Sequence, residues 1–363
     1  MTAPTRTRML RWGAPVAAAA AVAVVASGVL SAEADPPLPP KTAAQLLADV
    51  QGARVDGLSG TVVQDSDLGL PALPTAGPGS RGPASLASLL TGSHTLRVWY
   101  AGDTKQRLAL LGSLGESDLV RNGKDAWVWQ SEGNSATHYT LPAAVAGGKR
   151  TEPSLPAGVT PQQAAEQALA AIDPTTAVTT DGTRQVAGRD AYELVLAPKD
   201  DRSLIGQVRL AVDAATSIPL RVQVFGRTSS DGPAFSVGFT KVSFEVPGEE
   251  HFRFTPPPNA TVTEGELPAA GADHPSPADV ARAGSAVSTV GTGWTTVAVV
   301  RGVPVASADG ALGPVLQSLQ RVSGSWGSGR LLSSRLVSAL ITDDGRLLVG
   351  AVPPELLYAA ATK

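Results

Sequence analysis

The sequence contains no cysteine, which excludes disulfide bridges, thiolate metal sites and a cysteine nucleophile. It also lacks the cysteine that carries the lipid of a bacterial lipoprotein, so any membrane attachment must be made by the peptide or a partner. Charged residues are only 17% of the 363 residues and the net charge is -3, which argues against the basic stripe of a nucleic-acid-binding protein. Aromatic residues are 4%, so each tryptophan is an informative marker.

The N-terminal 34 residues have the pattern of an export signal. Arg6, Arg8 and Arg11 precede an apolar run over residues 13–30, and small residues follow at 31–34. A basic head, an apolar middle and small residues at the cleavage site are typical of a signal peptide, and a retained membrane anchor is the alternative. Both interpretations place the remaining chain outside the cytoplasm, because the arginines stay inside.

Alternating apolar residues predict strands over much of the chain. They recur from residue 95 to 141, where Asn122-Gly123 is a strong hairpin signal, and again from about 192 to 246. The apolar positions change parity near Thr240, which predicts a β-bulge. Thr42 is expected to cap a short helix, and a second helix is expected over residues 160–172. We therefore predict an α+β protein with one strongly curved antiparallel sheet, a half-closed barrel, and helices on its concave face.

Composition divides the mature chain into a large and a small unit. Residues 65–93 are rich in proline and glycine and form either a mobile insertion or a lid over a pocket. We expect the large domain to span residues 35–264, a linker to follow at 265–277, and a small α+β domain to occupy 278–363. Within the small domain we expect a strand at 294–300, a helix at 312–322, a loop at 323–329 and a final helix at 354–361. Between the loop and the final helix we expect a hairpin of two strands, 331–341 and 347–352, around a turn at 343–345.

The sequence shows little that points to catalysis. Its four histidines are scattered, no H-E-x-x-H motif occurs, and the segment at 324–329 lacks the G-x-S-x-G spacing of a nucleophile elbow. We therefore predict a protein that is not an enzyme and uses no metal and no cofactor. A catalytic triad assembled in space remains the alternative.

Several segments resemble the LolA-like lipoprotein carrier superfamily (the LolA, LolB and LppX fold), including its RseB/MucB branch of sigma-E regulators. The resemblance rests on Gly188-Arg189-Asp190-Ala191-Tyr192-Glu193-Leu194, on Pro219-Leu220-Arg221, on residues 252–257 and on residues 95–141. The stretch at 340–353 resembles the second domain of the regulator branch. The resemblance implies a half-closed barrel whose concave side holds acyl chains, and it supplies no catalytic residue.

A groove of this kind would bind hydrocarbon by replacing water around it, at about 0.8 kcal/mol per buried CH₂. Apolar strand residues are the candidates for its lining, although each could instead be ordinary core, and strand parity alone does not say which face is concave. We expect a charged residue at Trp127 or Trp129 to lower acyl-chain binding. The candidate residues are Leu96, Val98, Tyr100, Trp127, Trp129, Leu194, Leu210, Val222 and Phe239.

The sequence therefore predicts an exported protein of the cell envelope that binds the acyl chains of a lipid or lipoprotein for transport or presentation. The alternative is a sensor that binds a membrane protein partner, either an anti-sigma factor or a transporter. No nucleic-acid partner is expected.

Overall fold

The computed structural model describes most of the chain from Leu38 to its end, and this part forms one compact unit. The predicted signal segment, the centre of the proline-rich insertion, the helix at 160–172 and most of the linker lie outside the described residues. The described residues are 38–70, 91–112, 115–142, 174–228, 232–266, 287–302 and 313–363.

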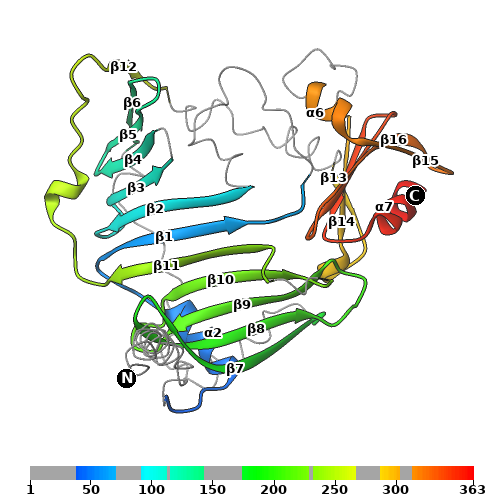
Figure 1. The fold of residues 1–363 in the computed structure, drawn as a ribbon, viewed down its shortest axis with the longest axis horizontal. Coiled ribbons are helices and arrows are strands. Elements are labelled where there is room, and N and C mark those ends of the chain that lie inside the picture. Colours follow the sequence, from blue (N-terminus) through cyan, green and yellow to red (C-terminus); the bar gives the residue numbers. More distant parts are fainter. Residues whose placement is uncertain are drawn as a thin grey trace, which may run out of the picture. The chain divides into compact units, whose positions relative to one another are not determined.

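A sheet of twelve strands dominates the fold (Figure 1). Its strand order is β12-β6-β5-β4-β3-β2-β1-β11-β10-β9-β8-β7, so it has two free ends and does not close. Neighbouring strands are antiparallel except β12, which pairs in parallel with β6 and was not predicted. The strands are β1 (Leu58–Ser66), β2 (Gly92–Tyr100), β3 (Lys105–Leu111), β4 (Glu116–Asn122), β5 (Asp125–Gln130), β6 (Ser135–Thr140), β7 (Thr176–Val186), β8 (Arg189–Pro198), β9 (Ile205–Asp213), β10 (Pro219–Gly226), β11 (Phe235–Ser243) and β12 (Thr261–Glu264).

The helix α2 (Ala43–Gly52) begins where the sequence predicts. The Thr42 side chain accepts a hydrogen bond from the backbone of Gln45, and the Gln45 side chain accepts one from the backbone of Thr42. This reciprocal capping box satisfies two amide groups that the first turn would leave unpaired. Leu46 on the inner side of α2 is buried against Tyr192 and Leu194 of β8, which attaches the helix to the sheet.

Two bulges bend the sheet near its middle. Thr61 pairs with Lys241 and Val62 with Phe239, so Thr240 is the extra residue, as the parity change predicts. A second irregularity lies at Leu220, between the pairs that join β10 to β9. Gly60 allows the close approach of β11, because a Cβ there would lie 2.4 Å from the Lys241 carbonyl oxygen. Extra residues of this kind increase local twist and bending, which accounts for a curved but unclosed sheet.

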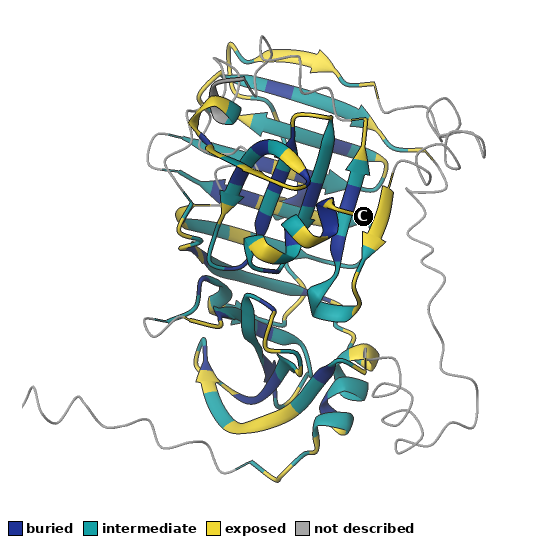
Figure 2. Cartoon of the chain, turned by 90° about the vertical axis from the view of Figure 1, so that its right-hand side faces the viewer, coloured by how far each residue is buried: buried dark blue, intermediate teal, exposed yellow. Residues whose placement is uncertain are grey.

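A second sheet of six strands has the order β13-β14-β18-β17-β16-β15. The helix α7 (Pro354–Ala361) contacts β17, β18 and β14, and its Leu357 belongs to a buried core with Leu340 and Leu348. Figure 2 shows buried residues in the middle of both sheets and exposed ones along their outer strands. The other elements are β13 (Val287–Val290), β14 (Val297–Arg301), α6 (Gly313–Ser318), β15 (Gln320–Gly324), β16 (Gly327–Ser333), β17 (Ser338–Thr342) and β18 (Arg346–Gly350), with short 3₁₀ turns η2 (Glu249–Phe252) and η3 (Gly293–Thr295).

Three predictions for the C-terminal part are wrong. The single strand expected at 331–341 is divided by a turn at 334–337 between β16 and β17. The expected helix at 312–322 ends at Ser318, and residues 320–324 form a strand instead. The glycine- and serine-rich segment expected as a loop is a tight hairpin between β15 and β16. Its Trp326 is buried and stacks on Tyr358 of α7 with ring centroids 5.4 Å apart. Tertiary packing therefore determines the conformation of a segment whose local composition suggests a loop. The final helix at 354–361 is confirmed.

Polar contacts join the two sheets. The Leu204 amide donates to the Ala351 carbonyl at 2.8 Å, and Trp294 Nε1 donates to Thr176 Oγ1 at 2.7 Å. Arg335 donates to the Asp67 carbonyl at 3.2 Å and forms an ion pair with the Asp67 carboxylate. The division into domains at 35–264 and 278–363 remains a prediction, although β12 ends at the expected boundary.

Candidate functional site

Strand register places seven of the nine candidate residues on one face of the large sheet, six of them in one connected series. Leu96 lies opposite Val62, which shares a face with Gln64, and Gln64 lies opposite Val237. Val237 lies opposite Val222, which faces Leu210, and Leu210 faces Leu194. Because alternate residues share a face, Leu96, Val98 and Tyr100 stand on the same side as Leu194, Leu210 and Val222.

Part of this face is covered and part is open. At β8 and β9, Leu194 is fully buried beneath α2, and Leu210 packs against the same cluster. At β2 to β5, register aligns four aliphatic side chains across consecutive strands. We call them the aliphatic row: Val98, Leu108, Leu119 and Val128.

The aliphatic row is unusual because its centre is exposed. Leu108 is 37% exposed and Leu119 is 49% exposed, although they are neighbours on the two middle strands of the row. Single exposed leucines are common on protein surfaces. Adjacent leucines on the same face as a buried core form an apolar patch, whose exposure to water is unfavourable in free energy. The sequence analysis did not select Leu108, Leu119 or Val128. The alternation of Leu108 with Leu110 was available as a signal, but the face shared by the row becomes evident only with the register.

The two tryptophans lie on the opposite face, and Phe239 packs apart from the six although register puts it on their face. Trp127 and Trp129 project from the opposite face of β5, where Trp127 contacts His138 and both rings contact Phe254, with centroid distances of 4.4, 5.3 and 6.1 Å. Phe239 pairs with Val62 beside the bulge, but it packs with the cluster of Ala191, Ala211 and Leu220 and not with that of Leu194. The nine candidates therefore do not line one continuous surface.

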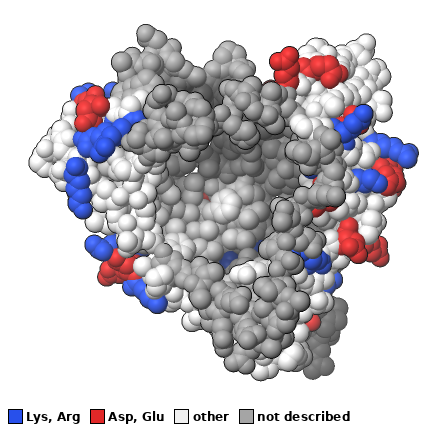
Figure 3. Space-filling model, turned by 180° about the vertical axis from the view of Figure 1, so that it is seen from behind, with Lys and Arg blue, Asp and Glu red and all other residues white. Residues whose placement is uncertain are grey.

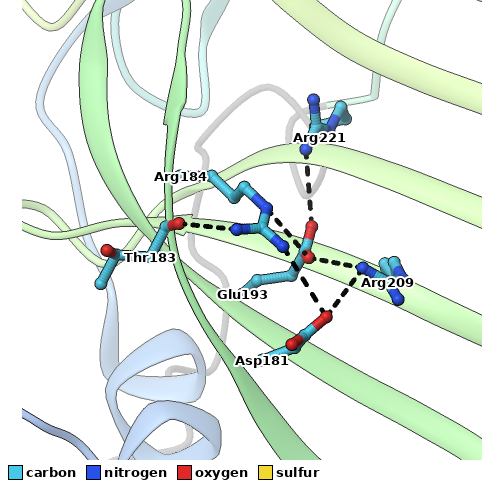
Figure 4. Close-up of polar contacts among 6 residues, drawn as sticks. All are labelled: Asp181, Thr183, Arg184, Glu193, Arg209 and Arg221. Carbon is cyan, nitrogen blue, oxygen red and sulfur yellow. Dashed lines mark hydrogen bonds and ion pairs between the residues drawn. The ribbon is translucent and has the colours of Figure 1, made fainter. Parts of the chain in front are cut away.

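The opposite face of the sheet carries most of the charged strand residues. Its central feature is Glu193, whose side chain is 2% exposed and accepts a hydrogen bond from Arg209 at 2.9 Å (Figure 4). Arg184 and Arg221 each approach the same carboxylate at 3.5 Å. Asp181 binds Arg209 from the other side at 2.9 Å. A buried carboxylate needs such partners, because an isolated charge away from water is very costly.

Two more buried carboxylates on this charged face are also paired with arginines. Asp118 forms an ion pair with Arg107, and burial raises the pKa of the nearby Glu116, helped by a hydrogen bond to Asp118. The Asp213 carboxylate accepts a hydrogen bond from Nη2 of Arg189 at 2.9 Å. Burial alone would raise the pKa of Asp213, but hydrogen bonds from Arg189 and Thr216 outweigh burial and hold it below its usual range.

Seen from behind, the described part of the molecule shows a hollow whose visible floor is mostly uncharged (Figure 3). A groove of about 1000 Å³ lies where the α2–β1 connection meets the β2–β3 turn. Tyr100 lines this groove and donates its hydroxyl to Asp103, while Lys105 and Glu249 on its wall form an ion pair. The groove combines polar and apolar walls at the end of β2, two residues from Val98.

Within the described ranges, no group of three or more histidine and acidic side chains is arranged to hold a metal ion. In that same part of the chain, no helix has both the length and the apolar character needed to cross a bilayer. The apolar run at residues 13–30 lies outside it.

No protein-family model matches the chain. No curated protein matches its sequence closely. Solved structures do resemble it. A chain of the Pseudomonas aeruginosa MucA/MucB complex aligns with a TM-score of 0.41 and 16% identity over 88% of this chain and 96% of that one. An uncharacterized conserved protein from Thermus thermophilus aligns with a TM-score of 0.33 and 13% identity over 61% and 98%.

A LolA superfamily protein from Nitrosomonas europaea aligns with a TM-score of 0.22 and 12% identity, over 59% of this chain and 99% of that one. These likenesses are distant and concern the fold alone. The solved structures that the chain resembles in this way include a LolA superfamily protein and MucB.

Proposed function

We propose that this protein binds the acyl chains of a lipid or lipoprotein on the face of the large sheet that carries α2, and that it does so outside the cytoplasm without catalysing a reaction. The observation that supports the proposal is the aliphatic row. Two adjacent leucines in it remain exposed, although they continue the apolar face that is closed by α2 a few strands away. A bound acyl chain would cover these two leucines and remove them from water.

The physical gain comes from removing hydrocarbon and leucine side chains from water together. Each methylene of a ligand contributes about 0.8 kcal/mol when buried, so one long chain gains on the order of ten kcal/mol before the cost of ordering is subtracted. An amphiphile also has a polar end that must stay hydrated. The partly polar groove beside Tyr100 is close to the row and suits such a head group.

The first experiment is extraction of the purified protein and native mass spectrometry. We expect a lipid to remain bound, and we expect displacement of a fluorescent fatty acid to give a saturable binding curve. Leu108→Lys and Leu119→Lys should each weaken acyl-chain binding roughly tenfold, about 1.4 kcal/mol, because each places an ammonium group against hydrocarbon. Both positions are exposed, so these variants should fold normally.

Two matched controls locate the site. Val337→Lys changes a similarly exposed residue in the turn between β16 and β17 of the second sheet and should bind like the original protein. Trp129→Lys changes the opposite face of the large sheet and should also leave binding unaltered, in contrast to the expectation from the sequence. Loss of binding in Trp129→Lys but not in Leu119→Lys would move the site to the tryptophan face. A protein that retains no lipid and binds no fatty acid would refute the proposal.

The regulatory alternative makes a different prediction in the same preparation. A sensor would capture an anti-sigma factor from solubilised membranes, and added fatty acid would change the amount captured. Such capture by the original protein and by Leu119→Lys alike would favour a protein partner over a lipid as the main ligand.

A further inference from the structure

The connection between β11 and β12 crosses the tryptophan face as a strap, residues 244–260, before β12 joins the sheet. The strap contains η2, and Figure 1 shows it running from β11 to β12 beside β6. His251 of the strap stacks on Trp99 with centroids 5.4 Å apart, and Phe254 contacts Trp127. Phe252 is almost completely buried. The strap itself is therefore anchored by aromatic residues.

β12, by contrast, is attached to the sheet by very little. It is four residues long, and all four of its side chains are exposed. Its backbone is bound at the ends of the ladder, where the amides of Thr261 and Gly265 donate to the carbonyls of Asn134 and His138 at 2.8 and 2.7 Å. A strand with no buried side chain gains almost nothing from the hydrophobic effect, so only polar contacts hold it in place.

Two side-chain contacts set the register of β12 on β6. The hydroxyl groups of Thr263 and Thr137 lie 3.3 Å apart. The Glu264 carboxylate approaches Nδ1 of His138 at 3.0 Å, while the Asp125 carboxylate approaches Nε2 of the same ring at 3.1 Å. The His138 ring also lies against Trp127, and its side chain is only 18% exposed. A carboxylate opposite His138 is thus the one charged contact that the described part of β12 makes with β6.

We propose that the edge of β6 is a docking site for an extended peptide of a partner protein, and that β12 occupies it as a displaceable internal substitute. The fitting partner is a strand that pairs in parallel with β6, carries small or β-branched side chains, and places a carboxylate opposite His138. Addition of a strand to a free sheet edge is a common mode of peptide recognition, because the main chain supplies affinity and alternate side chains supply specificity.

The chain itself supplies the probe for this site. A synthetic peptide with residues 259–265, Asn-Ala-Thr-Val-Thr-Glu-Gly, reproduces β12, and a second peptide with glutamine in place of the glutamate removes the charge. The receptor is the full chain with Thr263→Pro, because residue 263 lies midway between the two backbone bonds and proline cannot donate there. Ser288→Pro in β13, an exposed edge strand of the second sheet, is the matched control.

We expect Thr263→Pro to bind the glutamate peptide at least tenfold more tightly than the original protein, whose edge is occupied. The glutamine peptide should bind roughly two- to fivefold more weakly than the glutamate peptide, because it loses the carboxylate that contacts the His138 ring. Ser288→Pro should behave like the original protein. Binding is measured by the change in tryptophan fluorescence and by hydrogen exchange at residues 135–138.

Equal peptide affinity in Thr263→Pro and the original protein would overturn the proposal, and so would unchanged hydrogen exchange at residues 135–138 in Thr263→Pro. Glu264→Gln provides a test that does not depend on the proline variant, because it preserves the backbone and should speed hydrogen exchange in β6 by a similar factor of two to five. No change in that variant would show that His138 does not hold β12. Fatty-acid binding should be equal in all these variants, so the result stands apart from the proposed lipid site.

Discussion

The two faces of the large sheet differ in the kind of side chain that they bury and the kind that they expose. On the charged face, the buried carboxylates of Asp118, Glu193 and Asp213 each lie within contact of an arginine. On the α2 face, apolar groups are exposed and unmatched, as the leucines of the aliphatic row show. The first face pairs its buried carboxylates with arginines of the same chain, whereas the second leaves apolar surface that a ligand could cover.

This difference shows where a function is to be sought. The arginine–carboxylate pairs could be mistaken for a reactive site, because buried charges with perturbed pKa values are common in active sites. Here, however, each of these carboxylates is paired with at least one arginine from another strand, and arginine cannot give up its proton at ordinary pH. These pairs are therefore a structural device that joins strands, and the open side of the sheet is the better candidate for binding.

The largest effect should come from breaking the closed part of the α2 face. Leu194→Ala removes a fully buried side chain beneath α2 and should lower the free energy of unfolding by about 3 kcal/mol, because it leaves a cavity as well as losing apolar burial. Leu119→Ala on the same face should change it by less than about 0.5 kcal/mol. Urea unfolding of the two lipid-free variants measures the contrast. Similar losses in both would mean that the aliphatic row is part of the core.

The next largest effect concerns the charged face. Asp213→Asn removes the charged partner of Arg189 and should cost about 2 kcal/mol near neutral pH. Because the pKa of Asp213 is lower in the folded state than in the unfolded chain, its charge stabilises the fold fully above the unfolded value of about 4. This contribution is lost as the pH falls through the folded-state pKa.

The difference in stability between the original protein and Asp213→Asn should therefore be constant above about pH 5 and shrink below about pH 4. Unfolding curves recorded at a series of acidic pH values test this. A difference that persists undiminished to the lowest pH at which the protein folds would contradict the assigned role of the Asp213 charge, and Asp201→Asn, at an exposed turn, is the control.

Local signals in the sequence were sufficient for much of the sheet. The Asn-Gly turn located the β4–β5 hairpin, and the parity change located the bulge at Thr240. Both depend on neighbouring residues alone. β12 and the hairpin around Trp326 were missed, because each is held in place by residues far away in the chain: His138 for β12, and Tyr358 for Trp326.

The candidate site was harder to predict for the same reason. Alternation shows which residues of one strand share a face, and it correctly groups Leu96 with Val98. It does not show which face of β2 joins which face of β5, because that depends on register across three intervening pairings. Trp127 and Trp129 were grouped with Leu96 by hydrophobicity, yet register places them on opposite faces. Whether the aliphatic row binds acyl chains remains a prediction.

The smallest of these effects tests whether α2 is held by its own sequence or by the sheet. Thr42→Ala removes the oxygen that accepts the Gln45 amide and should cost about 1 kcal/mol, while Thr42→Ser keeps the oxygen and should cost much less. Because α2 covers only Leu194 and its neighbours, hydrogen exchange should quicken in α2 and leave the β2–β5 strands unchanged. If α2 instead forms a lid that closes over bound acyl chains, Thr42→Ala would also speed the release of a fatty acid. Measuring both hydrogen exchange in α2 and fatty-acid release in Thr42→Ala therefore shows whether α2 only covers the buried core or also moves when a fatty acid leaves.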